Sequence, residues 1–311
     1  MKGRIALLIP TFNGGDLLRQ TVESVLRAGL PAGGYRILVC DNCSTDGSVD
    51  SLPEDAAVFV HRNDANLGRI GNWNAAMAVA ETMGFSFAMY LMVGDLLEGQ
   101  EVIALRDRME RQDAALGIAC YRVVDPDLRP LRLARRICWR GDPERGIEAG
   151  RFLAQSLATG AMLFGPLGAN LYRIDGGVGL RFDDADQTHT DQLATALFTQ
   201  AAGKKVVYLD RPISSWRQRP GRFHAGITAE QRIEGDLRVI KGACRPARIA
   251  IDYEKLGANL LLRCLVYTRG NVALAWRASR ALTDGAWPSW RWLMTLLCRQ
   301  LHYQTPWMME V

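Results

Sequence analysis

The sequence lacks several features that would assign it to a class of protein directly. No run approaches the roughly 18 uncharged residues of a membrane-spanning helix, so we expect a cytoplasmic chain. The apolar run before Pro10 is only about six residues long, too short for a signal peptide, and predicts a first buried strand. The seven cysteines are an odd number without a regular framework, which favours a reducing compartment over a disulfide-bonded, secreted protein.

The net charge of the chain is small and assigns no class of protein either. The balance of 38 basic against 33 acidic residues gives a net charge of +5, which suits anionic partners but selects none of them. The basic residues are not gathered with aromatic residues into a recognisable nucleic-acid-binding module, so no nucleic acid is expected as a partner.

One short segment, ILVCDNCSTDGS at 37–48, has two possible interpretations. Cys40 and Cys43 have C-x-x-C spacing, which occurs in zinc and redox sites. A zinc site needs about four ligands, and no second close pair of Cys or His residues accompanies these two. The alternative, which we favour, is a strand that ends in a ligand-binding turn, with incidental cysteines.

The first hundred residues alternate between apolar runs and helical patterns. This β-α-β-α order, with strands that are continuously apolar, predicts a parallel sheet covered by helices. The expected strands are 4–10, 35–40, 57–62 and 87–93, and the expected helices are 16–29 and 72–84.

Polar and turn-forming residues follow each expected strand. They are Pro10 to Gly14, Asp41 to Asp46, Asn66 to Arg69, and Gly94 with Asp95. Ligands of parallel sheets bind beyond the carboxyl ends of the strands, so four such ends on one edge predict a binding cleft. Asp46 has the simpler alternative of an Asx-turn and helix cap.

These segments resemble the family 2 glycosyltransferases. IPTFNG is similar to the family's first strand and turn, CDNCSTDGS to its acidic loop, NLGRIGNWNAA to its N-x-G-x-x-x-N-x-N segment, and LMVGDLLEG stands at its D-x-D motif. The segment from GANLYRI to ISSWR is similar to the acceptor side of the family. The resemblance covers about residues 3–225.

The resemblance implies an α/β GT-A fold, with a mostly parallel central sheet flanked by helices and a C-terminal helical extension. It predicts a glycosyltransferase domain at 1–225, divided into a nucleotide-binding half (about 1–100) and an acceptor-binding half (about 101–225). A helical region at 226–311 would follow.

The implied reaction is an inverting transfer of a sugar from a UDP-, dTDP-, GDP- or CDP-sugar to an acceptor hydroxyl. Asp41 and Asn42 are the expected nucleoside contacts, because a carboxylate or amide can pair with the polar edge of a base. The family more often has a second aspartate where this chain has Asn42. The candidate nucleotide-binding residues are Pro10, Thr11, Asn13, Asp41, Asn42, Arg69 and Gly94, with a surface role as the alternative for Arg69.

A divalent cation, Mn²⁺ or Mg²⁺, is implied by the same resemblance. Asp95 corresponds to the last acidic position of the D-x-D motif, and His224 is a second candidate ligand. Met92 and Gly94 occupy the other acidic positions of that motif, so metal binding is expected to be weakened. An exposed loop histidine is the alternative for His224.

The catalytic base implied by the resemblance is Asp191, which precedes a helical pattern. A favourable first-turn charge is its alternative role. Asp183, Asp184 and Asp186 are less well placed rivals.

Three arginines follow the resembling segment, around Pro220 and Gly221. Guanidinium groups pair well with phosphate oxygens, so a mobile loop could carry them to the diphosphate and compensate for the thin acidic motif. They are Arg217, Arg219 and Arg222.

The last part of the chain is helical in pattern and net basic. From 246 to 311 it has eight Arg or Lys against four Asp or Glu, with four tryptophans in its final stretch. This composition suits peripheral contact with the inner membrane, where a glycan or polyprenyl-linked glycan acceptor would lie. Packing of the tryptophans against the catalytic domain or a second subunit is the alternative.

The sequence therefore predicts a metal-assisted, inverting glycosyltransferase that builds a bacterial surface glycan such as O-antigen, capsule or exopolysaccharide. Two other functions stay open at this point: a nucleotidyltransferase, and a non-catalytic binding or scaffold protein on the same fold.

Overall fold

The structure is a computed structural model. It describes residues 3–134, 142, 144–158, 164–183, 190–219, 227–228, 231–232, 234–235, 238–239, 242, 258, 261, 264–265, 271–282 and 290. The chain forms two compact units, one of residues 1–149, 164–184 and 198–219, the other of residues 150–163, 185–197 and 220–311. The domain division near residue 225 stays a prediction.

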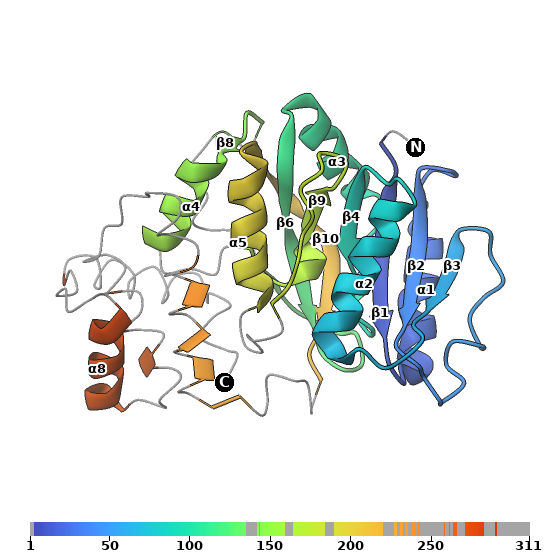
Figure 1. Ribbon diagram of the computed structural model, residues 1–311, viewed down its shortest axis with the longest axis horizontal. Coiled ribbons are helices and arrows are strands. Elements are labelled where there is room, and N and C mark those ends of the chain that lie inside the picture. The colour runs from blue at the N-terminus through green and yellow to red at the C-terminus, as the bar shows by residue number, and fades with distance from the viewer. Residues whose placement is uncertain are drawn as a thin grey trace. The chain divides into compact units, whose positions relative to one another are not determined.

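A mixed sheet forms the centre of the first unit (Figure 1). Its strands are β1 Ile5–Thr11, β2 Tyr35–Asp41, β3 Val58–Arg62, β4 Phe87–Tyr90, β5 Leu96–Leu97, β6 Ala114–Val124, β7 Pro130–Ala134, β8 Ile147–Glu148, β9 Asn170–Arg173 and β10 Lys205–Arg217. The order across the sheet is β3-β2-β1-β4-β9-β6-β10-β5, with β7 beside β6 and β8 beside β10.

Parallel pairs of strands occur in two parts of this sheet. β3, β2, β1 and β4 pair in parallel, as do β6 and β10. β9 runs antiparallel between β4 and β6, and β5, β7 and β8 are also antiparallel to their neighbours. The predicted α/β GT-A fold with a central sheet flanked by helices is confirmed. The sheet was expected to be mostly parallel, but it is mixed, because β5, β7, β8 and β9 join the described sheet in antiparallel pairs.

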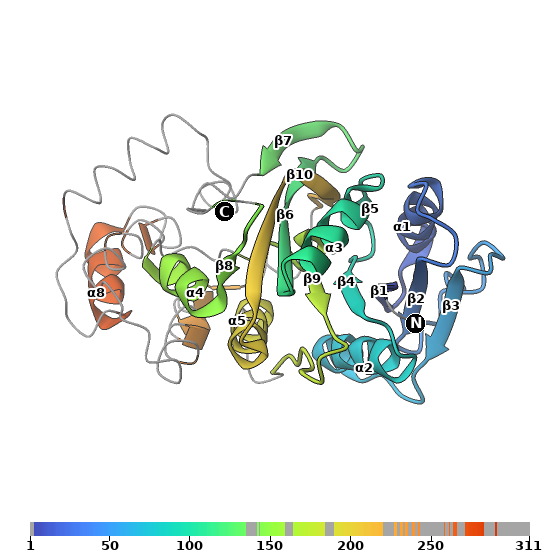
Figure 2. The same ribbon diagram turned by 90° about the horizontal axis from the view of Figure 1, so that it is seen from above.

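Helices cover both faces of the parallel strands. The helices whose bounds the structure gives are α1 Gly15–Arg27, α2 Gly68–Thr82, α3 Glu101–Arg111, α4 Ala149–Ala158, α5 Thr190–Ala202 and α8 Val272–Leu282, with a 3₁₀ turn at Leu167–Ala169. Figure 2 shows α1 and α3 on one face of the sheet and α2 on the other. No helix in the described part of the chain is long and apolar enough to cross a membrane.

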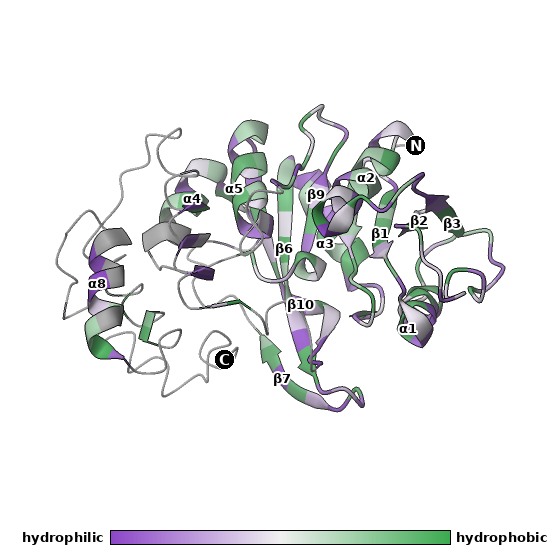
Figure 3. Ribbon diagram, turned by 60° about the horizontal axis from the view of Figure 1, so that its bottom comes forward, coloured by the Kyte–Doolittle hydropathy of each residue, from purple (hydrophilic) through white to green (hydrophobic). Residues whose placement is uncertain are grey.

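The side chains of β1 point alternately to the two faces of the sheet, which explains why helices cover both faces. Ile5, Leu7 and Ile9 point to one face and belong to the same fully buried cluster as Leu18 and Val22 of α1. Complete burial of such a side chain stabilises the fold by about 1.5–3 kcal/mol. Figure 3 shows the contrast along the sheet: the central strands are mostly green or pale, whereas the exposed end of β3 is purple.

The carboxyl ends of the parallel strands meet at one edge, as the sequence predicts. Thr11, Asp41 and Arg62, the last residues of β1, β2 and β3, stand directly beside one another in register. The loops that follow these strands therefore start from a common edge, and their side chains can contact one another.

One element begins earlier than expected. The periodicity predicts a helix from residue 72, but α2 starts at Gly68. The reason is a set of distant and local hydrogen bonds: Asn66 Oδ1 accepts from Gly68 N at 2.9 Å, and Asn42 Oδ1 accepts from Leu67 N at 2.8 Å. Side chains rather than apolar spacing fix this helix start.

Candidate active site

The loops after β1 and β2 hold each other in place. Asn13 N donates to Ser44 Oγ, and Thr45 N donates to Asn13 Oδ1, both at 2.9 Å. Asn13 has φ of +51°, a left-handed conformation that asparagine tolerates better than most residues. The side-chain oxygen of Asn13 thus ties two loops together, and its contact with a nucleotide stays a prediction.

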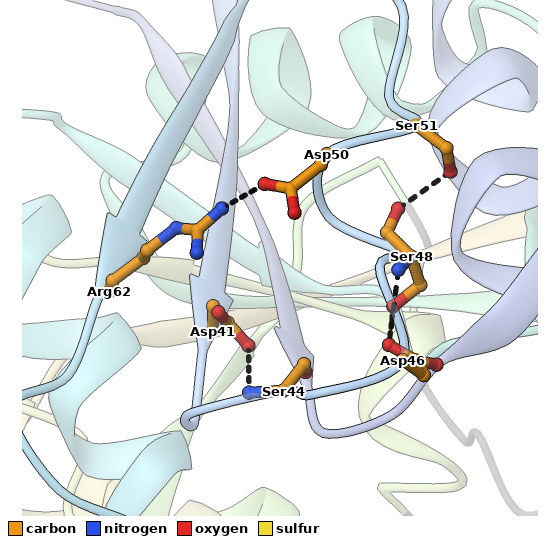
Figure 4. Close-up of polar contacts among 7 residues, drawn as sticks. All are labelled: Asp41, Ser44, Asp46, Ser48, Asp50, Ser51 and Arg62. Carbon is orange, nitrogen blue, oxygen red and sulfur yellow. Dashed lines mark hydrogen bonds and ion pairs between the residues drawn. The ribbon is translucent and has the colours of Figure 1, made fainter.

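Asp41 closes β2 as a buried carboxylate, with 1% of its surface exposed. Its Oδ1 accepts a hydrogen bond from Ser44 N at 2.9 Å, as Figure 4 shows. This bond fixes the turn and the direction of the carboxylate. A buried, oriented carboxylate at the carboxyl edge of a parallel sheet is suited to recognise a hydrogen-bond donor on a ligand.

Asp46 serves the loops rather than a ligand. Its Oδ2 accepts from Gly15 N, the first residue of α1, at 2.9 Å, and its Oδ1 accepts from Ser48 N at 3.1 Å and Ser48 Oγ at 2.6 Å (Figure 4). The hydrogen bonds from Ser48, and then that from Gly15, lower the pKa of Asp46 below its ordinary 3.8. The structural role that the sequence left open for Asp46 fits this geometry.

Asn42 is the centre of a hydrogen-bond network beneath the site. Its Nδ2 donates to Asn66 Oδ1 at 2.7 Å and Gly68 O at 3.2 Å, and its Oδ1 accepts from Asn63 Nδ2 at 3.0 Å and from Leu67 N. These four bonds use the hydrogen-bonding groups of a side chain that is only 3% exposed. The geometry assigns Asn42 the task of holding α2 against β2, while contact with a nucleoside stays a prediction.

The two asparagines of the N-x-N segment are structural residues that the sequence analysis left without a role. Asn72 Nδ2 donates to Cys40 O at 3.0 Å and to Thr11 O at 3.3 Å, across the ends of β2 and β1. Asn74 exchanges two 2.9 Å hydrogen bonds with the backbone of Phe182. Two asparagines spaced two residues apart at the start of the expected helix are the sequence feature from which these roles could have been predicted.

Arg69 lies half-buried on the first turn of α2. Its guanidinium carbon is 4.7 Å from the ring centroid of Trp73, one turn further along the helix. Stacking on an indole restrains an arginine and adds a cation–π attraction. The side chain is thereby more restrained than a fully solvated surface arginine, although what it binds stays a prediction.

Asp95 sits in a turn that is supported by α1. Thr21 Oγ1 accepts from Gly94 N at 2.8 Å and donates to Asp95 O at 3.0 Å, and all of these groups are buried. The carboxylate is 4% exposed, and its Oδ1 accepts from Arg217 N at 3.1 Å. Thr21 gave no signal in the sequence, because it belongs to a helix 73 or more residues away from its partners.

Arg217 differs from its expected place in a mobile loop. It is the last residue of β10, is 3% exposed, and donates from Nη2 to Gln20 Oε1 at 3.0 Å. The side chain is therefore directed to α1, and the prediction of a loop is wrong at this residue. Arg222 and His224 lie outside the described residues.

Arg219 lies against Gly94. Its Nη2 donates to Val93 O at 2.6 Å. A Cβ atom added to Gly94 would stand 3.0 Å from the guanidinium carbon of Arg219 and 3.1 Å from its Nη2. Gly94 has φ of +91°, which side chains rarely adopt, so both backbone and space favour glycine here.

At the described D-x-D positions, Asp95 is the one carboxylate offered to a divalent cation. Within the described part of the chain no group of three or more His, Cys, Asp or Glu side chains is placed to bind a metal. Met92 and Gly94 offer no carboxylate, one oxygen of Asp95 already accepts a hydrogen bond, and the Arg219 guanidinium lies beside Gly94. Hard cations require several oxygen ligands.

The C-x-x-C pair is not arranged as a redox centre. Cys40 is a fully buried residue of β2, and burial raises the pKa of its thiol to about 12, so the reactive thiolate is disfavoured. Cys43 donates to Asn63 O at 3.3 Å, and both cysteines are free thiols. The interpretation that this pair is incidental agrees with these contacts.

Asp191 lies in the first turn of α5, as its sequence predicts. It is half-buried, its Oδ2 accepts from Gln192 Nε2 at 3.3 Å, and its backbone oxygen accepts from Thr195 Oγ1 at 2.7 Å. Asp183 is exposed at the end of the segment clasped by Asn74. Asp184 and Asp186 lie outside the described residues.

The described part of the C-terminal region includes α8 and two stacked tryptophans. Trp276 of α8 and Trp290 have ring centroids 6.1 Å apart and planes inclined by 14°. Trp290 is 58% exposed, so a large apolar surface is presented to solvent.

Comparison with solved structures gives the class of protein that this fold and site define. Residues 1–349 of S. aureus TarS in complex with UDP-GlcNAc match with a TM-score of 0.63 and 16% identity, over 96% of this chain and 86% of that one. The mannosyltransferase PcManGT from Pyrobaculum calidifontis, in complex with GDP-Man and Mn²⁺, matches with a TM-score of 0.55 and 13% identity, over 97% and 81% of the two chains. The architecture is that of a GT-A glycosyltransferase.

The sequence places the chain within that class. The family model "Glycosyl transferase family 2" matches residues 6–160, about half of the chain. The chain belongs to glycosyl transferase family 2, which confirms the resemblance seen in its motifs. No curated protein matches the sequence.

Proposed function

We propose that the chain transfers one sugar, with inversion, from a nucleoside diphosphate sugar to a hydroxyl of a growing surface glycan. The observation that supports it most is the placement of Asp41 and the Gly94–Asp95 turn at the carboxyl ends of parallel strands, each fixed by hydrogen bonds. The fold's relatives in complex with UDP-GlcNAc and GDP-Man support a nucleotide-sugar donor. Family membership favours this function over a nucleotidyltransferase or a scaffold.

The residues would divide the work as follows. Asp41 would accept a hydrogen bond from the nucleobase or ribose, because its Oδ1 is already oriented by Ser44. Pro10 and Thr11 end the neighbouring strand, and Arg69 stands on the first turn of α2. Asn13 and Asn42 would act by holding the loops and α2 in place.

In the transfer step, the acceptor oxygen forms a bond to the anomeric carbon while the bond from that carbon to the β-phosphate oxygen breaks. The electron pair leaves with the diphosphate, and the acceptor proton passes to the carboxylate of Asp191. Negative charge grows on the diphosphate, so a cation must stabilise it. The sequence predicts Mn²⁺ or Mg²⁺ held by Asp95 and His224, of which Asp95 is among the described residues and His224 is not.

The donor can be identified by calorimetric titration of the intact chain with UDP, dTDP, GDP and CDP. We expect one of them to bind much more tightly than the others, and Asp41→Ala to weaken it. Failure of folded protein to bind any of the four would refute the proposal.

The role of Asp191 has its own test. Replacing a general base typically lowers turnover by about 10²–10⁴-fold. We expect Asp191→Asn to lower kcat in this range while the Kd for the nucleoside diphosphate stays unchanged. A variant with normal turnover would leave Asp191 with only its role in the first turn of α5.

The acceptor is proposed to lie at a membrane surface. Support comes from the net basic C-terminal region and from the exposed Trp290 stacked on Trp276. We expect the intact chain to float with anionic liposomes and Trp290→Ala to float less. Equal flotation of both proteins, or none, would count against this contact.

A further inference from the structure

Gly94 and Arg219 form a pair in which each depends on the other. The guanidinium carbon, Nη2 and Nε of Arg219 all lie within 3.3 Å of the point where a Cβ atom of residue 94 would stand. An aspartate at this position of the D-x-D motif would therefore require the guanidinium to shift from its present place, and it would also have to adopt the φ of +91°. The glycine gives the space that the guanidinium occupies.

The position of Arg219 is fixed from both sides. Gln218 N donates to Val124 O at 2.8 Å, and Arg217 N donates to Asp95 Oδ1, so the backbone leading to Arg219 is tied to β6 and to the Asp95 turn. The 2.6 Å hydrogen bond from Nη2 to Val93 O then sets the orientation of the guanidinium. The positive charge stands beside the motif before any ligand arrives.

A guanidinium at this point can stabilise negative charge on phosphate oxygens, as a metal ion does. It stays protonated at every physiological pH, and its planar fork of N–H donors matches phosphate oxygens. Met92 and Gly94 offer no carboxylate for a cation, whereas Arg219 brings a positive charge to the same turn. The chain thus has glycine where a carboxylate would bind a metal ion, and an arginine that supplies positive charge at the same turn.

We propose that the Arg219 guanidinium stabilises the departing diphosphate in place of a protein-held divalent cation, so that donor binding and transfer proceed without metal. The inference rests on the proposed function, because it concerns the same donor. As the bond from the anomeric carbon to the β-phosphate oxygen breaks, the electron pair stays on that oxygen, and the guanidinium donates hydrogen bonds to the charge that develops there.

The test is calorimetric titration of the intact chain with the nucleoside diphosphate that it binds best, once with EDTA and once with Mn²⁺. We expect the two Kd values of the native chain to agree within about threefold. Arg219→Gln should weaken binding by about 10²-fold in EDTA, because hydrogen bonds to charged groups are the strong ones. The Kd of Arg219→Lys in EDTA should lie between those of the native chain and Arg219→Gln, because an ammonium keeps the charge but lacks the planar fork of donors.

The matched control is Arg211→Gln, which removes an arginine of the same strand β10. Arg211 is exposed and pairs with Glu101, at 3.0 Å, and the described contacts of Arg211 include none with Gly94 or Asp95. We expect its Kd to equal that of the native chain, and the melting temperatures of all variants show whether they are folded.

The outcomes separate the two proposals. Native binding that is at least tenfold weaker in EDTA than in Mn²⁺, or an Arg219→Gln variant that binds as tightly as the native chain in EDTA, would overturn the inference while the proposed function stands. Failure of the folded native chain to bind any nucleoside diphosphate in either buffer would overturn both.

Discussion

Replacing Asn42 with aspartate would give this chain the residue that resembling proteins more often carry at that position, and we expect it to be destabilising. Asn42 Nδ2 donates to Asn66 Oδ1 and to Gly68 O. A carboxylate cannot donate, so Asn42→Asp would leave three acceptor groups facing one another at the start of α2. A flip of the Asn66 amide gives no relief, because its Oδ1 also accepts from Gly68 N.

The magnitude follows from these contacts. Two hydrogen bonds are lost, each worth about 0.5–1.5 kcal/mol net, and the repulsion between close acceptors adds to this loss. We expect the free energy of unfolding to fall by about 2–4 kcal/mol. For a domain of this size the melting temperature would fall by roughly 4–16 °C.

Thermal unfolding at pH 7, followed by circular dichroism, measures the effect. Asn66→Asp is the matched control: it is the same chemical change at a neighbouring residue whose oxygen only accepts, so we expect almost no loss. At low pH the gap between Asn42→Asp and the native chain should narrow, because a protonated carboxyl regains one donor. An Asn42→Asp variant that melts like the native chain but binds nucleotide less tightly would refute the reasoning and favour a nucleoside contact.

Two further predictions concern the supports of the site. Thr21→Val keeps the shape of the residue but removes both hydrogen bonds to Gly94 N and Asp95 O, so it should lower the free energy of unfolding by roughly 2–5 kcal/mol in urea. Thr21→Ser, which keeps the hydroxyl, should lose clearly less, and equal losses would argue against these bonds. Asp46 has a lowered pKa in the folded chain, so its contribution is complete above pH 3.8 and is lost as the pH falls through the folded value. The excess melting temperature of the native chain over Asp46→Asn should therefore shrink as the pH falls below 3.8, and a gap that grows in acid would contradict this account.

The sequence predicted the local elements of the first half well. Continuous apolar runs placed β1 to β4, because strands buried on both faces need apolar side chains at every position. It also predicted that their polar ends share one edge, since parallel strands must align in this way. It did not predict β9, which pairs with β4 although Arg173 and Phe87 are far apart in the chain.

Contacts between distant segments also limited what the sequence could predict about the candidate site. Asp41, Asp95 and Asp191 could be chosen from their motifs, but the motif around Asn42 resembles a ligand contact and its side chain proved to be committed to α2. Thr21 gave no signal, because its partners lie in a distant turn.

By itself, then, the sequence determined the α/β fold, the common edge at which the first strands end and the family of the protein, because these depend on periodicity and on short local motifs. Only the tertiary structure decided which polar side chains hold the loops and which cation lies beside Gly94. Hydrogen bonds between distant segments and the space left by Gly94 for Arg219 depend on how the chain packs, and no local pattern encodes them.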